Sequence, residues 1–200
     1  MGGALGQALV LIISSLGSLY LLAVLLRFLL QAARADFYNP VTQAIVKLTS
    51  PLVVPLRRII PGYRGLDFAT LVLALILNSL FTGLALLVSG YTSVAIGTII
   101  SWSFVGLIAF ILNIYFWSLL VSVIASFIAP FSGHPVLLLI HQLLEPLYNR
   151  VRRILPPMGG LDFSPILMFL GIQVLEILIV TTLRQQLGMG DVVAKLVIGV

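Results

Sequence analysis

The stretch RRIIPGYRGLDF, residues 57–68, returns as RRILPPMGGLDF, residues 152–163. In both places two arginines, a proline, a glycine and an aspartate precede a long apolar run. Proline ends a helix and glycine permits a sharp turn, so each phrase predicts a corner in the chain. The aspartate stands where the N-cap of the next helix is expected, and there its carboxylate meets the positive end of the helix dipole. The doubled phrase therefore predicts two equivalent corners, each leading into a helix.

The two phrases belong to a longer internal repeat. A shift of 95 positions aligns the two halves of the chain without a gap, and 14 of 29 positions from Pro40 to Phe68 are identical. Prolines, arginines, a glycine and an aspartate are among the matches, which apolar composition alone does not explain. We predict a duplicated unit with a first repeat at residues 1–90, a second at residues 91–185 and a C-terminal tail at residues 186–200.

The composition places most of the chain in lipid. Hydrophobic residues make up 60% of the sequence and charged residues only 8%, whereas soluble domains carry about 25% charged residues. The mean hydropathy is +1.20, and a soluble fold of this length cannot shield so much apolar surface from water. The net charge of +5 comes from basic residues beside apolar runs. Anionic headgroups explain that placement, and no folded basic domain is left for nucleic acid.

Four apolar runs are long enough to span a bilayer, which takes about 20 residues. They lie at Leu5–Leu30, Leu66–Val88, within Val94–Ile128, and at Leu161–Leu183. The third window exceeds one span, so we expect its first part, around Gly97, to lie at the interface or beyond it. The first run lacks a basic start and is longer than the apolar core of a signal peptide, so we interpret it as a span.

The connection between the two spans of each repeat is polar and amphipathic. Lys47, Arg57 and Arg58 make the first connection a poor span, because a charge at the bilayer centre costs ~2.5–3.5 kcal/mol. Polar residues recur at helical spacing in both connections, and Pro51 and Pro146 are expected to interrupt the two helices. The predicted fold class is an all-α membrane protein with four transmembrane helices in two parallel repeats. Each repeat has an amphipathic helical segment that is either interfacial or shallowly re-entrant.

The orientation follows from the number of crossings. Each repeat crosses the membrane twice, so both repeats start on the same side and are related by an axis along the membrane normal. Both basic connections then lie on one side, while the connection at residues 89–94 carries no charge. By the positive-inside rule we expect the basic connections in the cytoplasm and both termini outside. Arg184 and Lys195, which follow the fourth span beyond Leu183, fit this orientation less well.

The charged residues of the two corners form the first candidate site. Arginine side chains can bury their stems beside lipid, hold their guanidinium groups among phosphates and pair with an aspartate across a turn. We interpret these residues as a structural corner at the interface, and an ion site or a contact with lipid or a partner protein is the alternative. They are Arg57, Arg58, Asp67, Arg152, Arg153 and Asp162.

Polar residues inside the spans form the second candidate site. Glu176 is the only acid well inside a span, and such acids are functional candidates by default. We expect it to be protonated, to hydrogen-bond to a serine or asparagine of a neighbouring span, or to face a polar cavity, and a place in an ion pathway is the alternative. Asn78, Asn113 and Gln173 are expected to form interhelical hydrogen bonds. Arg27, near the inner end of span one, is expected to extend to the headgroups.

No pattern in the sequence predicts catalysis, a cofactor or a metal. His134, His141 and Glu145 share a helical face and are of the types that bind zinc, but the first repeat does not reproduce the set. The chain contains no cysteine, which excludes disulfides and thiolate chemistry. The sequence motifs of serine hydrolases, nucleotide-binding loops and zinc proteases are absent.

The doubled phrase carries a family resemblance. NPV, SPL, RRIIP and RGLDF in the first half, with a span on either side and a second copy of the pattern, resemble the YggT family of small bacterial membrane proteins. The resemblance covers residues 19–183 and implies an integral protein of the bacterial inner membrane without an assigned enzymatic activity. Family members have been linked to potassium uptake and osmotic-shock tolerance, to assembly of membrane complexes, and to division or nucleoid organisation. His134 and Glu145 replace Asn39 and Ser50 in the second copy, so functions tied to those positions are not transferred.

Two functions remain open from the sequence. The first is a non-enzymatic scaffold, or an assembly or modulating factor for a membrane complex, whose arginines engage anionic lipid and a partner membrane protein. The alternative is a small channel or a transporter-modulating component in potassium or osmotic homeostasis. The expected partners are the bilayer, its anionic headgroups, other membrane proteins and further copies of the chain, and nucleic acid is not among them.

Overall fold

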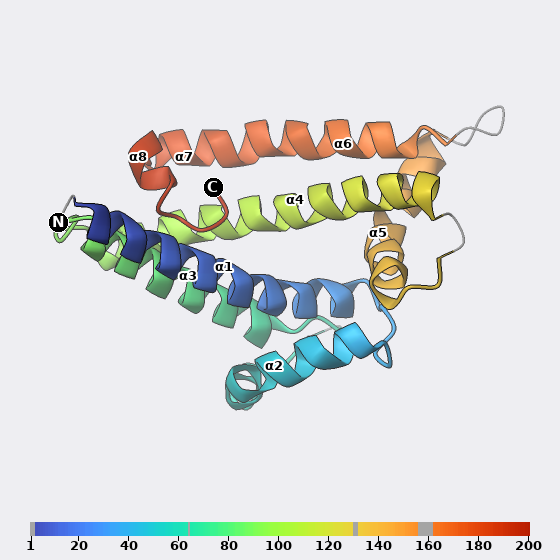
Figure 1. The fold of residues 1–200 in the computed structure, drawn as a ribbon, viewed down its shortest axis with the longest axis horizontal. Coiled ribbons are helices and arrows are strands. Elements are labelled where there is room, and N and C mark those ends of the chain that lie inside the picture. Colours follow the sequence, from blue (N-terminus) through green and yellow to red (C-terminus); the bar gives the residue numbers. More distant parts are fainter. Residues whose placement is uncertain (1–2, 64, 130–131, 156–161) are drawn as a thin grey trace.

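The computed structural model describes residues 3–63, 65–129, 132–155 and 162–200. The regular elements in these ranges are helices (Figure 1). They are α1 (Ala4–Ala32), α2 (Pro40–Arg57), α3 (Phe68–Val88), α4 (Ile96–Ile128), α5 (Pro135–Ile154), α6 (Ser164–Leu175), a π-helical segment (Glu176–Thr181), α7 (Thr182–Gln186) and α8 (Asp191–Ala194).

Four helical stretches are long and apolar enough to cross a membrane. They are α1, α3, α4 and the continuous stretch Ser164–Gln186, which joins α6, the π-helical segment and α7. The predicted all-α membrane fold is therefore confirmed. Residues 96–128 form one unbroken helix, which at about 1.5 Å per residue is longer than the roughly 30 Å hydrocarbon core.

The four spans stack in order across the molecule. Helix α1 packs mainly on α3, α3 on α4, and α4 on the stretch that begins with α6 (Figure 1). Each repeat thus contributes a neighbouring pair of spans, and α3 and α4 join the two repeats. The buried side chains at the centre of the molecule come from both repeats and include Leu25, Leu73, Leu107 and Leu143.

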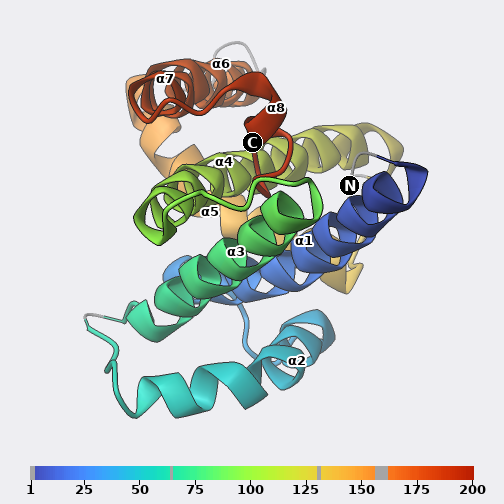
Figure 2. The ribbon, with the colours of Figure 1, turned by 90° about the vertical axis from the view of Figure 1, so that its left-hand side faces the viewer.

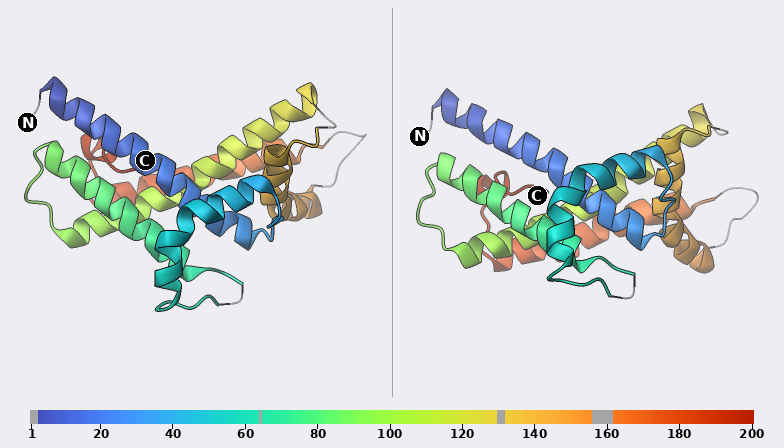
Figure 3. Two further views of the ribbon diagram at one scale, coloured as in Figure 1. Left: turned by 60° about the horizontal axis from the view of Figure 1, so that its bottom comes forward. Right: turned by 90° about the horizontal axis from the view of Figure 1, so that it is seen from below.

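The surface helices α2 and α5 begin at the same end of the bundle. Helix α5 crosses the ends of α4 and α6, and α2 runs obliquely beneath α1 and α3 (Figures 1 and 3). Their N-termini touch, because the Asn39 amide donates a hydrogen bond to the Pro135 carbonyl at 2.9 Å. These residues hold nearly equivalent places in the two repeats.

Both surface helices continue through their prolines. Pro51 lies inside α2, and Pro146 lies inside α5, so the predicted interruptions are wrong. A proline removes one hydrogen bond and its ring clashes with the preceding turn, which a helix can accommodate by bending. Figure 2 shows such a change of direction along α2. The Asn39 side chain caps α2 by accepting a hydrogen bond from the Val41 amide at 2.9 Å.

The C-terminal tail folds back into the bundle (Figures 1 and 3). Val197 and Ile198 are almost fully buried, and Ile198 packs with the central cluster of both repeats. A Cβ atom on Gly106 would lie 2.5 Å from the Ile198 carbonyl oxygen, so glycine is required for this approach. No pattern in the sequence predicts this insertion.

Candidate functional site

The first corner, residues 57–68, contains an ion pair between the exposed Arg57 and the buried Asp67. Asp67 is the N-cap residue of α3 and is only 2% exposed. Its carboxylate accepts hydrogen bonds from Arg57 Nε at 2.9 Å, from Arg57 Nη2 and from the Thr70 hydroxyl at 2.5 Å. Gln31 at the end of α1 reaches the same corner, with its amide 3.2 Å from the Gly65 carbonyl. The corner therefore ties α1, α2 and α3 together.

The second corner, residues 152–163, repeats the pair in a more open form. Arg152 donates to Asp162 from Nε at 3.1 Å and from Nη2 at 2.6 Å. Asp162 is 30% exposed and also accepts a hydrogen bond from the Ser164 amide at 2.9 Å. The N-cap residue of α6 is Phe163, so the N-cap position predicted for Asp162 is wrong by one residue. The Arg152 guanidinium lies over the Tyr148 ring, 4.9 Å from its centroid. Both predicted arginine–aspartate pairs are thus present, but only the aspartate of the first pair is buried.

Other predicted corner residues lie apart from these pairs. Arg58 and Arg153 are exposed, and neither makes an ion pair within the described ranges. Gly65 has φ +83°, a conformation that glycine adopts without strain. The predicted corner positions Arg64, Pro156, Gly160 and Leu161 lie outside the described residues.

The lowered pKa values of the two corner aspartates make the stability of the fold depend on pH. Burial raises the pKa of Asp67, but hydrogen bonds from Arg57 and Thr70 outweigh it and bring the pKa below its ordinary value. The Ser164 and Arg152 hydrogen bonds likewise lower the pKa of Asp162. A carboxyl group with a lowered folded-state pKa stabilises the fold above its unfolded-state pKa of about 3.9, and this stabilisation is lost as the pH falls through the folded-state value.

We therefore expect acid to weaken the corners. Thermal unfolding in detergent should show a constant midpoint from pH 7 to about pH 5 and a falling midpoint below about pH 4. Asp67→Asn, which cannot ionise, should flatten the part of the acid slope that comes from the first corner. An equally steep slope in Asp67→Asn and wild type would show that Asp67 does not contribute to it.

Arg27 is placed differently from the prediction. Instead of extending to the headgroups, it is only 7% exposed and lies under α2. Its Nη1 donates to the Thr49 hydroxyl at 2.8 Å and to the Val46 carbonyl and the Ser50 hydroxyl at 3.2 Å. The Thr and Ser hydroxyl groups of α2 supply acceptors close to the helix, so the guanidinium need not reach the headgroups.

The predicted interhelical hydrogen bonds are only partly present. Asn78 is fully buried in α3 and donates to the Ser103 carbonyl of α4 at 2.9 Å, which confirms the prediction, and to the Ile198 carbonyl of the tail at 3.4 Å. Asn113 donates at 3.3 Å to the Gly199 carbonyl of the tail, not to another span. For Gln173 the prediction is wrong, because its side chain is exposed. Its helix α6 packs on the bundle through other residues.

Glu176 lies on the outer face of the fourth span. It is exposed and makes no hydrogen bond or ion pair with the described residues, so the predicted bond to a neighbouring span is wrong. The helix changes to a π-helical form at this residue, and single π-turns inside α-helices occur frequently at functional sites. The fourth span is also the least buried of the four: 17% of the residues in its most apolar 18-residue stretch are buried inside the protein, against 28–33% in the other spans.

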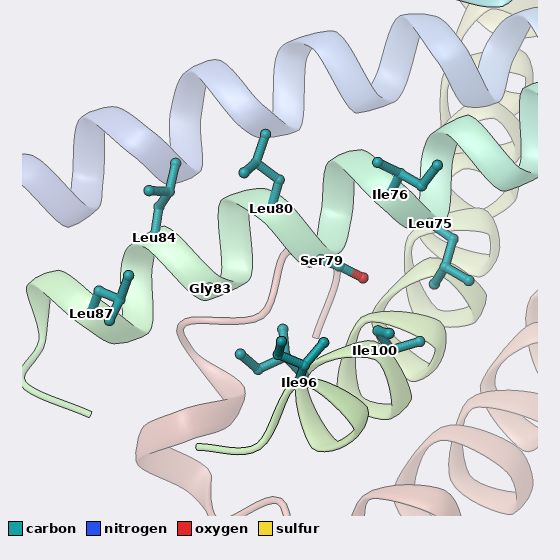
Figure 4. Close-up of a pocket in the computed structure, with 10 residues that line it drawn as sticks. Leu75, Ile76, Ser79, Leu80, Gly83, Leu84, Leu87, Ile96 and Ile100 are labelled. Carbon is teal, nitrogen blue, oxygen red and sulfur yellow. The ribbon is translucent and has the colours of Figure 1, made fainter. Parts of the chain in front are cut away.

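The junction between the repeats contains an apolar pocket of about 460 Å³ (Figure 4). Leucine and isoleucine side chains of α3 and α4 line it, together with Ser79 and Gly83. The Ser79 hydroxyl is buried without a hydrogen-bond partner in the described structure. An ion in this pocket would meet one hydroxyl and no charged group, so the lining suits acyl chains or apolar side chains.

The three residues that the sequence offered as possible metal ligands are His134, His141 and Glu145. The His134 Nδ1 accepts a hydrogen bond from the Val136 amide at 3.3 Å and so caps α5. His141 and Glu145 line a pocket of about 750 Å³ beside Arg152 and Asp162. In the described part of the chain, no three His, Cys, Asp or Glu residues are grouped so that they could hold a metal ion.

Comparison with known proteins gives the family of the chain. Two segments, residues 6–100 and 101–183, match the CCB3/YggT family model. The chain is 45% identical over 186 residues to the uncharacterized protein PA0392 of Pseudomonas aeruginosa, covering 92% of this chain and 94% of the relative. It is 42% identical to an uncharacterized protein of Vibrio alginolyticus, covering 81% and 88%, and 37% identical to the uncharacterized protein YggT of Escherichia coli K12, covering 85% and 88%. No solved structure matches. The chain belongs to the CCB3/YggT family.

Proposed function

We propose that the protein is a non-enzymatic scaffold or assembly factor that binds a partner membrane protein through its fourth span. The observation that carries the proposal is the exposure of Gln173 and Glu176 on that span. Lipid chains offer these side chains no hydrogen-bond partner, and an ionised side chain at the bilayer centre costs ~2.5–3.5 kcal/mol. A partner helix with a donor group would remove that cost.

The rest of the outer face suits a helix as well. Helix α6 and the π-helical segment pack on α4 and α5 from one side (Figure 1), and Leu170 and Val174 are exposed. Between them, Gly171 has no atom within 4 Å of the place where a Cβ would stand. Small residues allow close approach of helices in lipid, where packing and hydrogen bonds drive association.

The setting proposed for this task is the bacterial inner membrane, with both corners on the cytoplasmic side. Each basic connection joins the two spans of one repeat, so the two connections would lie on the same side of the membrane, and the connection at residues 89–94 carries no charge. Positive residues are retained on the cytoplasmic side of inner-membrane proteins. Exposed Arg58 and Arg153 would then face anionic headgroups.

The alternative is a small channel or a transporter-modulating component in potassium or osmotic homeostasis. It would place Glu176 along an oligomer axis, facing water instead of a partner helix. The apolar lining of the pocket between α3 and α4 (Figure 4) supports scaffolding over ion passage at that junction.

The test is a pull-down from gentle detergent with the outer face altered. Wild type should be recovered with a stoichiometric membrane partner, and the double variant Gln173→Leu, Glu176→Leu should lose it by about tenfold, the effect of removing ~1–2 kcal/mol of polar contacts. The isolated variant should be at least as stable as wild type, because the substitutions remove polar groups from a lipid-facing surface.

Trp117→Leu is the matched control, since Trp117 is 59% exposed on α4 and its replacement should leave recovery of the partner unchanged. A wild-type chain that purifies as a homo-oligomer and conducts potassium in liposomes would overturn the scaffold proposal. Equal partner recovery by the double variant and wild type would show that the fourth span is not the binding surface.

A further inference from the structure

The first repeat contains a basic pocket under α2 that the proposed function does not use. It has a volume of about 550 Å³ and lies between the end of α1 and α2. Arg27, Arg34 and Arg57 line it, and no carboxylate does. The only acid bonded to these arginines in the described residues is Asp67, which pairs with Arg57.

Arg27 has unused hydrogen-bond donors in this pocket. All of its hydrogen bonds to described residues come from Nη1, which leaves Nε and Nη2 without an acceptor there. A guanidinium group presents five N–H donors in a planar fork that matches a phosphate group. An anion bound there would accept hydrogen bonds from these donors and also compensate the buried charge, which a neutral acceptor would not do.

Thr42 supplies a second and independent indication of a ligand. Its side chain lines the same pocket, the residue is only 7% exposed, and its hydroxyl has no hydrogen-bond partner in the described structure. A buried hydroxyl without a partner costs roughly 1–3 kcal/mol, so an acceptor bound in the pocket would remove that penalty. Arg34 is exposed and has φ +57°, a backbone conformation in which glycine would be less strained.

The equivalent pocket of the second repeat has the opposite character. Ser122 stands where Arg27 stands in the first repeat, and Glu145 stands in place of Ser50. The second pocket is lined by Arg152 together with the carboxylates of Glu145 and Asp162. The duplicated architecture therefore holds one pocket that suits an anion and one that does not.

The walls of the basic pocket indicate where the anion comes from. Leu30 and Ile45 line it and also line the adjacent pocket, whose polar lining is limited to Ser118. Apolar side chains do not stabilise a free phosphate ion. A bound phospholipid, in contrast, would have its phosphate beside the arginines and its acyl chains against the apolar side chains. We propose that this pocket binds the phosphate group of an anionic phospholipid through Arg27, Arg34 and Thr42.

The experiment uses the full-length chain in nanodiscs of phosphatidylcholine, with and without 20% phosphatidylglycerol (about one lipid in five). Native mass spectrometry after release into detergent should show one retained phosphatidylglycerol per chain. Arg34→Gln should weaken its retention about tenfold, the loss of one charge-assisted hydrogen bond. The control Arg153→Gln removes the same charge from an exposed and unpaired position and should change retention less than about twofold, because no pocket holds the lipid there.

Thr42→Val separates binding from folding. It should weaken retention of the lipid about threefold. The lipid-free variant should melt no lower than wild type, because the Thr42 hydroxyl makes no hydrogen bond in the described structure that the substitution could remove. Equal losses in Arg34→Gln and Arg153→Gln would overturn the proposal in favour of general attraction to a basic surface. Stabilisation by inorganic phosphate in phosphatidylcholine discs, with no added effect of phosphatidylglycerol, would overturn the assignment to lipid. The result does not depend on the fourth span, so it can fail or succeed separately from the scaffold proposal.

Discussion

Replacing Asp67 with alanine is expected to lower the free energy of unfolding by about 2 kcal/mol. Asp67 is 2% exposed and accepts hydrogen bonds from Arg57 and Thr70, so its removal leaves the Arg57 guanidinium and the buried Thr70 hydroxyl without their acceptor. Breaking a fully buried pair costs about 3–5 kcal/mol, and the 40% exposure of the Arg57 side chain places this pair lower. Reversible unfolding in mixed micelles would measure the difference.

The second repeat provides the control for this prediction. Asp162→Ala removes the equivalent carboxylate from a pair whose side chains are 47% and 30% exposed, and exposed pairs contribute only about 0–1 kcal/mol. Asp162 is not the N-cap residue of α6, which is Phe163, so we expect a total loss of about 1 kcal/mol or less. A loss at Asp162 as large as that at Asp67 would contradict the claim that burial, and not the sequence motif, determines how much each corner stabilises the fold.

Gly106→Ala is expected to destabilise the chain by about 2 kcal/mol and to release the tail. The added methyl group would stand 2.5 Å from the Ile198 carbonyl oxygen and 2.8 Å from a Val197 methyl group. Backbone atoms cannot move aside as a flexible side chain does, so the tail must shift. Asn78 would then lose its contact with Ile198. The released tail should be cut faster by trypsin after Lys195, which mass spectrometry would detect.

Gly83→Ala serves as the matched control inside a spanning helix. A Cβ on Gly83 would meet only the tip of Ile99 at 3.9 Å, and alanine is favoured over glycine in a helix by about 1 kcal/mol. This variant should be unchanged or more stable, with its tail protected from trypsin. Equal behaviour of Gly106→Ala and Gly83→Ala would show that the tail does not rest against α4 as described.

The fold was predictable where its determinants are close in sequence. Apolar runs of about 20 residues specify spans because each helix satisfies its own backbone hydrogen bonds in lipid. The corners were predictable for the same reason, since Arg57 and Asp67 are ten residues apart and a single turn brings them together. The positions of the site residues were harder to predict from the sequence. An arginine on a span can extend to the headgroups or turn under a neighbouring helix, and the sequence around Arg27 does not distinguish these two positions.

The sequence by itself determined the helical class, the four spans, the duplicated unit and its two arginine–aspartate corners. Only the tertiary structure decided which corner aspartate is buried, where Arg27 finds its acceptors, and that the tail enters the bundle. The Asn78–Ile198 contact joins residues 120 positions apart, and it depends on the space that Gly106 leaves between helices. Hydropathy and turn chemistry act over one helix or one turn, whereas such contacts depend on the shapes of surfaces that exist only after the helices have packed.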